Sequence, residues 1–175
     1  MRGPRVSRVG VVVDLLTGPA PAGDADGIEV LTEAECLDLL ASTTIARIGL
    51  SAGSLPVILP VNFVLDGGSI VVCTGPGLKL RAAVARDVAC LEVDDHDPVG
   101  HLGWSVLVTG RLSEIAGPAA VRAAERLPLA PWRHIDDVHF IRLSMDLVSG
   151  RRLRRERSDP PEPVDLPPYP TDLHR

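Results

Sequence analysis

Six strand-like segments, joined for the most part by short turns, constrain the fold of this chain more than any other feature. They are rich in Val, Ile, Leu and Thr and read IARIGL (45–50), LPVILPVNFVL (55–65), SIVVCT (69–74), VACLEVD (88–94), WSVLVTGRLSEI (104–115) and VHFIRLSMDLVS (138–149). Glycines in the turns at 51–54 and 66–68 can adopt the positive φ angles that tight hairpins require. The pattern predicts a mainly β fold, a small six-stranded antiparallel barrel rather than a doubly wound sheet.

Helices are predicted at three places between these strands. The first begins after Thr32, because Glu35 three residues later completes a capping box and an apolar helical face follows. Two shorter helices are expected over 78–86 and 118–127. With so few helices, the chain has little material of its own to cover the outside of a barrel.

Three strands contain nearly continuous apolar runs instead of a clean alternation: VILPV (57–61), IVVC (70–73) and VLV (106–108). Strands of this kind need apolar cover on both faces. The barrel interior covers one face, and we expect a second subunit to cover the other, which predicts a homodimer. The alternative is that the helices and the C-terminal tail of the same chain supply this cover.

The two ends of the chain differ in composition from its middle. Residues 1–28 are rich in Gly, Pro and Ala and are expected to form a flexible arm, and residues 158–175 form a proline-rich tail. The folded domain is therefore expected over 29–157. A net charge of −5 argues against a nucleic-acid partner, and no apolar run is long enough to predict a membrane span, so we expect a cytoplasmic protein.

The segment TGPGLKL (74–80) contains the only lysine of the chain, Lys79. A strand, a Gly-Pro-Gly turn and a helix start bring backbone N–H groups, the Thr74 hydroxyl and the Lys79 ammonium together, which is the outline of a phosphate site. The Walker spacing is absent. The alternative is a solvated lysine, although such a residue at a helix start opposes the helix dipole.

The order and spacing of LPVNF (59–63), TGPGLKL, CLEVDD (90–95), GWSVLVTGRLSEI (103–115) and VSGRR (148–152) resemble the pyridoxamine 5′-phosphate oxidase-like family of FMN-binding split barrels. The resemblance covers about residues 32–152 and implies a dimer with FMN in a cleft between subunits. It also implies which residues bind the cofactor: Pro60, Val61, Asn62 and Phe63 along the ring, Thr74, Lys79 and Leu80 at the phosphate, and Trp104, Ser105 and Arg151 near the interface. Deazaflavin, haem or no cofactor are the alternatives within such a family.

Two hypotheses about activity follow. The first is an FMN-dependent oxidoreductase in which the flavin, rather than a protein side chain, carries electrons between a small-molecule donor and a small acceptor. The second is a non-catalytic module that holds flavin, deazaflavin or haem for sensing or storage. The acidic stretch Asp94 to Asp97 with His96 is interpreted as a solvated turn rather than a metal site, and Cys36, Cys73 and Cys90 as buried free thiols.

Overall fold

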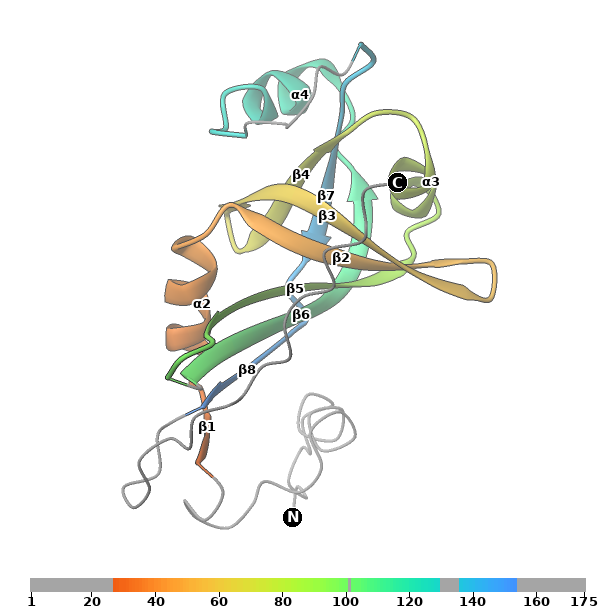
Figure 1. Cartoon of the computed structure of the whole chain (residues 1–175). Coiled ribbons are helices and arrows are strands. Elements are labelled where there is room, and N and C mark those ends of the chain that lie inside the picture. Colours follow the sequence, from red (N-terminus) through yellow and green to blue (C-terminus); the bar gives the residue numbers. More distant parts are fainter. Residues whose placement is uncertain (1–26, 101, 130–135, 154–175) are drawn as a thin grey trace, which may run out of the picture.

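The computed structural model describes residues 27–100, 102–129 and 136–153 (Figure 1). The proline-rich tail and nearly all of the N-terminal arm lie outside these ranges, so the predicted domain boundaries remain predictions. The elements follow in the order β1 (Ile28–Val30), α2 (Glu33–Ala41), β2 (Ile45–Ala52), β3 (Leu55–Asp66), β4 (Ser69–Thr74), α3 (Leu78–Val84), β5 (Val88–Asp97), β6 (Leu102–Glu114), α4 (Pro118–Ala124), β7 (His139–Ser144) and β8 (Leu147–Leu153).

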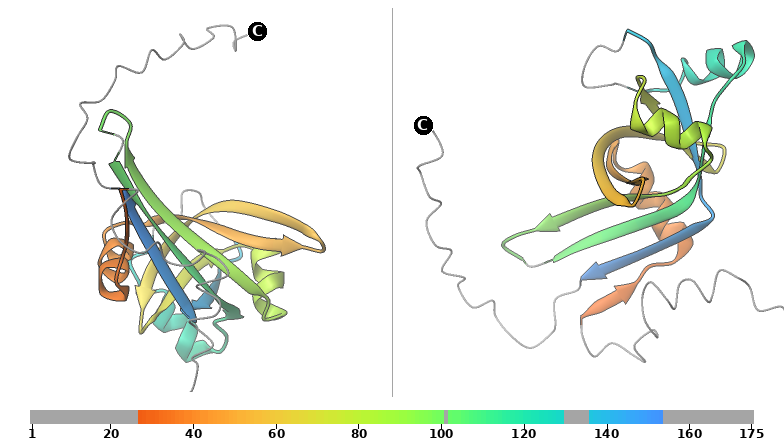
Figure 2. Two further views of the ribbon diagram at one scale, coloured as in Figure 1. Left: turned by 90° about the horizontal axis from the view of Figure 1, so that it is seen from below. Right: turned by 90° about the vertical axis from the view of Figure 1, so that its right-hand side faces the viewer.

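The strands form one antiparallel sheet in the order β1-β8-β6-β5-β2-β3-β4-β7, and a further pairing of β6 with β7 closes the strands from β2 to β7 into a ring. The closure is uneven, because β6 pairs with β8 along its first half and with β7 only through its last residues (Figure 2). The prediction of a mainly β, six-stranded split barrel is confirmed, and β8 and β1 extend the sheet beyond the ring.

The last predicted strand is wrong in one respect, because it is broken at Met145–Asp146 into β7 and β8. The break lies where the backbone passes close to Gly110 of β6. A Cβ on Gly110 would stand 1.8 Å from the Ser144 carbonyl oxygen, so only glycine fits there. The Ser144 hydroxyl accepts a hydrogen bond of 2.8 Å from the Arg111 backbone N–H and so fixes the crossing.

The capping box predicted for the first helix is confirmed. The Glu35 carboxylate accepts from the Thr32 backbone N–H at 2.8 Å, and the Thr32 hydroxyl accepts from the Glu35 backbone N–H at 3.3 Å. This helix, α2, buries Cys36 and Leu40 against the sheet. The other two helices are present at the predicted places but are shorter at their C-terminal ends, with α3 ending at Val84.

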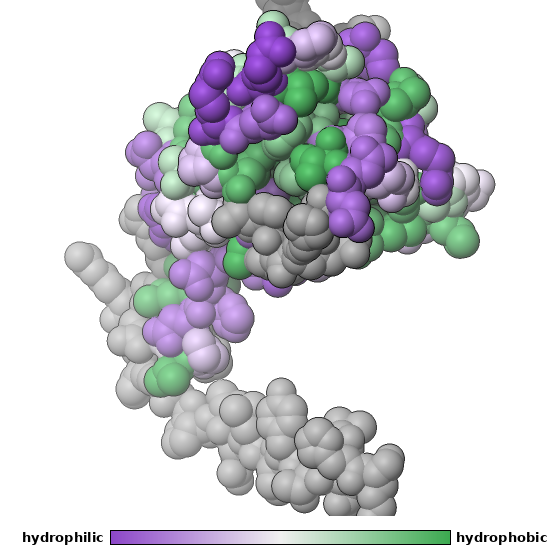
Figure 3. Space-filling model, turned by 90° about the horizontal axis from the view of Figure 1, so that it is seen from above, coloured by the Kyte–Doolittle hydropathy of each residue, from purple (hydrophilic) through white to green (hydrophobic). Residues whose placement is uncertain are grey.

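Two apolar clusters decide which outer surfaces of the barrel are covered. The large one fills the ring, and a smaller one, Val71, Ala124 and Phe140, lies outside it where α4 covers β4 and β7. The outer face of β2, β3 and β5 carries exposed apolar side chains, among them Ile45 (49%), Ile58 (70%) and Val88 (54%). Apolar patches are also exposed among polar side chains at the end of the molecule that carries α3 and α4 (Figure 3).

Candidate functional site

The turn between β4 and α3 holds the predicted phosphate residues. Gly77 precedes the helix with a φ of 152° and a ψ of −156°, a conformation that side-chain-bearing residues rarely adopt, and a Cβ there would meet nothing within 4 Å. Thr74 is buried, and its hydroxyl donates to the Gly75 carbonyl oxygen at 3.1 Å. Because α3 has only seven residues, the charge of Lys79 outweighs any helix dipole at this turn.

Lys79 is half-buried in the first turn of α3. Its neighbours Leu78 and Leu80 pack against the main core, which anchors the helix on the barrel end. Burial raises the pKa of the Cys73 thiol, and the positive charge of Lys79 partly opposes that rise, so the ammonium lies near the end of β4. The lysine is therefore held beside the Gly-Pro-Gly turn by the packing of its own helix.

His139 belongs to the same end of the barrel, and sequence reasoning missed its setting. It is the ladder partner of Thr74 and lies between two carboxylates, 3.2 Å from Glu114 and 3.3 Å from Asp137. Burial lowers the pKa of His139, but the hydrogen bonds to Asp137 and Glu114 and the negative charges of these two carboxylates together outweigh it and raise the pKa above its ordinary value. A second cation therefore forms near Thr74 more readily than for an isolated histidine.

Residues 60–63, which were predicted to lie along the flavin ring, direct their side chains to both sides of β3. Val61 and Phe63 are buried in the barrel core, whereas Pro60 and Asn62 point to the outer face. Val61 and Phe63 can therefore reach a ligand only through their backbone. Pro60 lies opposite Arg47 of β2 and Asn62 opposite Ile45, so this part of the outer face joins two strands.

A cleft opens where β2 and β5 separate beyond the pair Arg47 and Glu92. It has a volume of about 430 Å³ and is lined by Thr43, Ile45, Ala46, Arg47, Pro60, Asp94, Asp95 and His96. Arg47 forms an ion pair with Asp94 and another with Glu92 at 3.4 Å. Burial and the neighbouring Asp94 raise the pKa of Glu92, and Arg47 counteracts this, so the cleft wall carries an internally paired charge network.

Ser105 and Arg151 are ladder partners of β6 and β8, and both face outward. They line an adjoining cavity of about 310 Å³ together with Ile28, Asp94, Asp95, His96, Gly103, Trp104 and Leu153. Asp94 to His96 were interpreted as a solvated turn, but the structure places them inside β5 and in the walls of both cavities. The run of four polar residues gave no strand signal, because only the pairing with β6 holds it extended.

The two groups of predicted residues lie at opposite ends of the long hairpin formed by β5 and β6 (Figure 1). Trp104 and Ser105 are near the start of β6, whereas the carbonyl oxygen of Asp87, in the turn that follows α3, accepts a hydrogen bond from the Leu112 backbone N–H near its end. Seven or eight residues of strand separate these points, about 25 Å at 3.3 Å per residue. One chain therefore does not bring Lys79 and Arg151 into a single small-molecule site.

Comparison with known proteins places these features in a family. Residues 32–152 match the model of the family described as pyridoxamine 5′-phosphate oxidase. The chain belongs to this family. The matched segment includes the β4–α3 turn, most of the residues that line the two outward-facing cavities and nearly all of the sheet, and the predicted family resemblance is confirmed.

Individual relatives agree with this assignment. An uncharacterized protein of Mycobacterium tuberculosis, Rv0080, is 33% identical over 131 residues, which cover 72% of this chain and 86% of that protein. The structure of an FAD binding protein from Mycobacterium smegmatis is 33% identical, has a TM-score of 0.61 and covers 72% of this chain and 100% of its own. A conserved protein of unknown function from Corynebacterium diphtheriae is 28% identical, with a TM-score of 0.61 and coverages of 73% and 99%.

No group of three or more His, Cys, Asp or Glu side chains in residues 27–100, 102–129 and 136–153 is arranged to hold a metal ion. Within the same residues, no helix is both long enough and apolar enough to cross a membrane.

Proposed function

We propose that this protein binds a flavin nucleotide, FMN, with the phosphate at the β4–α3 turn. The observation that carries the proposal is the turn itself: a half-buried Lys79 beside Thr74, with open space around Gly77. An ammonium and backbone N–H groups suit a phosphate, and the open glycine allows a ligand to approach the backbone. The family match and the FAD-binding relative at 33% identity support a flavin rather than another phosphate ester.

The site is shared between two copies of the chain in this proposal. Since the β6 residues beside the two groups, Leu112 near the end of α3 and Ser105 opposite Arg151, are about 25 Å apart along the strand, Lys79 and Arg151 can serve one flavin only if they come from different subunits. The exposed apolar outer face of β2, β3 and β5 is the surface that a second copy would cover, because α4 already covers the other side. Pro60 and Asn62 of this face would then lie along the isoalloxazine ring.

A bound flavin supplies hydride and electron transfer, and we propose an oxidoreductase that uses it between a small donor and a small acceptor. The residues of the chain would bind and orient the cofactor: Lys79 and the turn at the phosphate, and Ser105, Trp104 and Arg151 of the second copy near the ring. The three cysteines are free thiols, which supports a reducing, cytoplasmic location.

The ligand that co-purifies with the full-length protein tests this function directly. We expect a flavin absorption spectrum and a released ligand with the mass of FMN, and saturable quenching of FMN fluorescence when apo protein is titrated. Reduction of the bound flavin by a nicotinamide donor, followed by saturable reoxidation by an acceptor, would distinguish an enzyme from a storage module. Apo protein that neither carries nor quenches any flavin would overturn the proposal.

A further inference from the structure

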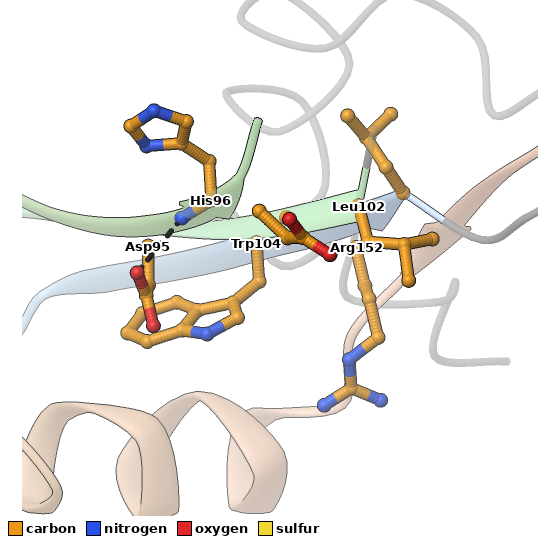
Figure 4. A pocket seen from close by; sticks show the side chains of 8 residues that line it. Asp95, His96, Leu102, Trp104 and Arg152 are labelled. Carbon is orange, nitrogen blue, oxygen red and sulfur yellow. Dashed lines mark hydrogen bonds between the residues drawn. The ribbon is translucent and has the colours of Figure 1, made fainter. Parts of the chain in front are cut away.

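A third cavity lies at the hairpin end of β5 and β6, on the side that faces α2 (Figure 4). Its volume is about 270 Å³, and it is lined by Asp95, His96, Asp97, Leu102, Gly103, Trp104, Arg152 and Leu153. Alternation along the strands assigns Asp95, Trp104 and Arg152 to this inner face, whereas Ser105 and Arg151 point to the outer face. The cavity adjoins the outer one and shares Asp95, His96, Gly103, Trp104 and Leu153 with it, but its arginine is Arg152 instead of Arg151.

The positive wall of this cavity is already neutralised. Arg152 lies 3.4 Å from Glu29 and 3.6 Å from Glu35, so one guanidinium faces two carboxylates. Glu35 is further held by the capping box, with its carboxylate 2.7 Å from the Thr32 hydroxyl. These contacts tie β1, α2 and β8 together and leave Arg152 little capacity to attract an anionic ligand.

The opposite wall combines an aromatic ring with an unneutralised carboxylate. Figure 4 shows the Asp95 carboxylate beside the Trp104 indole, both on the α2 side of the strands. Asp95 accepts one hydrogen bond, 2.9 Å from the His96 backbone N–H, and no described residue forms an ion pair with it. Trp104 also packs against the main core, which fixes the orientation of its ring.

We propose that this cavity binds an organic cation with a single ring, such as an aromatic amine. The indole face attracts a cation, the Asp95 carboxylate pairs with its charge, and Leu102, on the same face of β6 as Trp104, contacts its apolar part. The volume is at the lower limit for ligand pockets, which suits one ring and excludes a dinucleotide. The proposal does not require flavin binding, although Asp95 and Trp104 also line the outward-facing cavity beside Ser105 and Arg151.

The test uses three probes that share a phenyl ring and differ in charge: benzylammonium, benzyl alcohol and benzoate. The Trp104 indole N–H resonance reports binding in the Trp132→Phe background, because the chain has only two tryptophans. We expect benzylammonium to shift this resonance saturably and to bind at least about fivefold more tightly than benzyl alcohol, with benzoate weakest. Benzylammonium should also lose affinity as the salt concentration rises.

Asp95→Asn should reduce benzylammonium affinity to that of benzyl alcohol and leave benzyl alcohol binding unchanged, because it removes charge but keeps the side-chain shape. Asp38→Asn, which neutralises an exposed carboxylate on α2, is the matched control and should change neither. Equal binding of the three probes, no shift of the Trp104 resonance, or an Asp95→Asn variant with unchanged affinity would each overturn the proposal. A parallel FMN titration of the same samples tests flavin binding separately.

Discussion

Replacement of Lys79 by alanine is expected to weaken FMN binding without a matching loss of fold stability. The Thr74 hydroxyl already donates to Gly75, and α3 is only seven residues long, so the ammonium carries much of the proposed phosphate interaction. A charge-assisted hydrogen bond of this kind contributes about 1.5–3 kcal/mol. The dissociation constant for FMN should therefore rise about ten- to hundred-fold.

Fluorescence titration of apo protein with FMN and with riboflavin gives the two affinities needed. Riboflavin lacks the phosphate, so wild type and Lys79→Ala should bind it equally, whereas Lys79→Arg should keep most of the FMN affinity. Thermal unfolding of the apo proteins provides the control for stability. Equal FMN affinity in wild type and Lys79→Ala, or an equal loss for riboflavin, would refute a phosphate role for this lysine.

Three further predictions concern pH, packing and assembly. The folded-state pKa of His139 is raised, so the stability that His139 contributes is fully present below the ordinary pKa of 6.5 and is lost as the pH rises through the folded-state pKa. His139→Gln should remove this pH dependence of the melting temperature. A variant with the wild-type pH profile would contradict the prediction. Gly110→Ala should destabilise the fold by more than about 3 kcal/mol in chemical denaturation, because the new Cβ would overlap the Ser144 carbonyl oxygen. Gly53→Ala is the control: it has open space but an unfavourable positive φ, and should destabilise the fold by about 1–2 kcal/mol. Similar losses of stability in the two variants would contradict the packing argument. Ile58→Glu on the exposed outer face should shift the dimer toward monomer in sedimentation experiments. Val99→Glu, at the 80% exposed hairpin tip between β5 and β6, is the control and should leave the dimer intact. A stable Ile58→Glu dimer would place the interface on another surface.

The ring of strands could be predicted from the sequence, because each strand and each tight turn is marked by residues within its own segment. Runs of β-branched residues mark the strands, and glycines at 53, 67 and 68 adopt the positive φ angles that their turns need. The break at Met145–Asp146 could not be predicted, because it depends on a close approach to Gly110, which is distant in sequence. A prediction from apolar content alone therefore treated residues 138–149 as one strand instead of two.

The candidate site could be predicted only in part. Because side chains alternate between the two faces of a strand, the sequence already separates Asn62 from its buried neighbours Val61 and Phe63. The family resemblance, in contrast, predicts a flavin contact for residues 60–63 as a whole. The extension of β5 to Asp97 carried no apolar signal, because its last residues are exposed and are held only by pairing with β6. The contacts that define the cavities arise from this pairing, so Asp94 to His96 were not recognised as lining residues.

Subunit complementation tests the shared flavin site most directly. Lys79→Ala and Arg151→Ala chains, each weak in FMN binding alone, are co-expressed with different tags, and the mixed dimers are purified. If one site uses Lys79 of one copy and Arg151 of the other, each mixed dimer has one intact site and one site that lacks both residues. Random pairing then leaves about one quarter of all sites intact in the unfractionated mixture. We predict wild-type FMN affinity at one site per mixed dimer, whereas weak binding at both sites would contradict a site built from two chains.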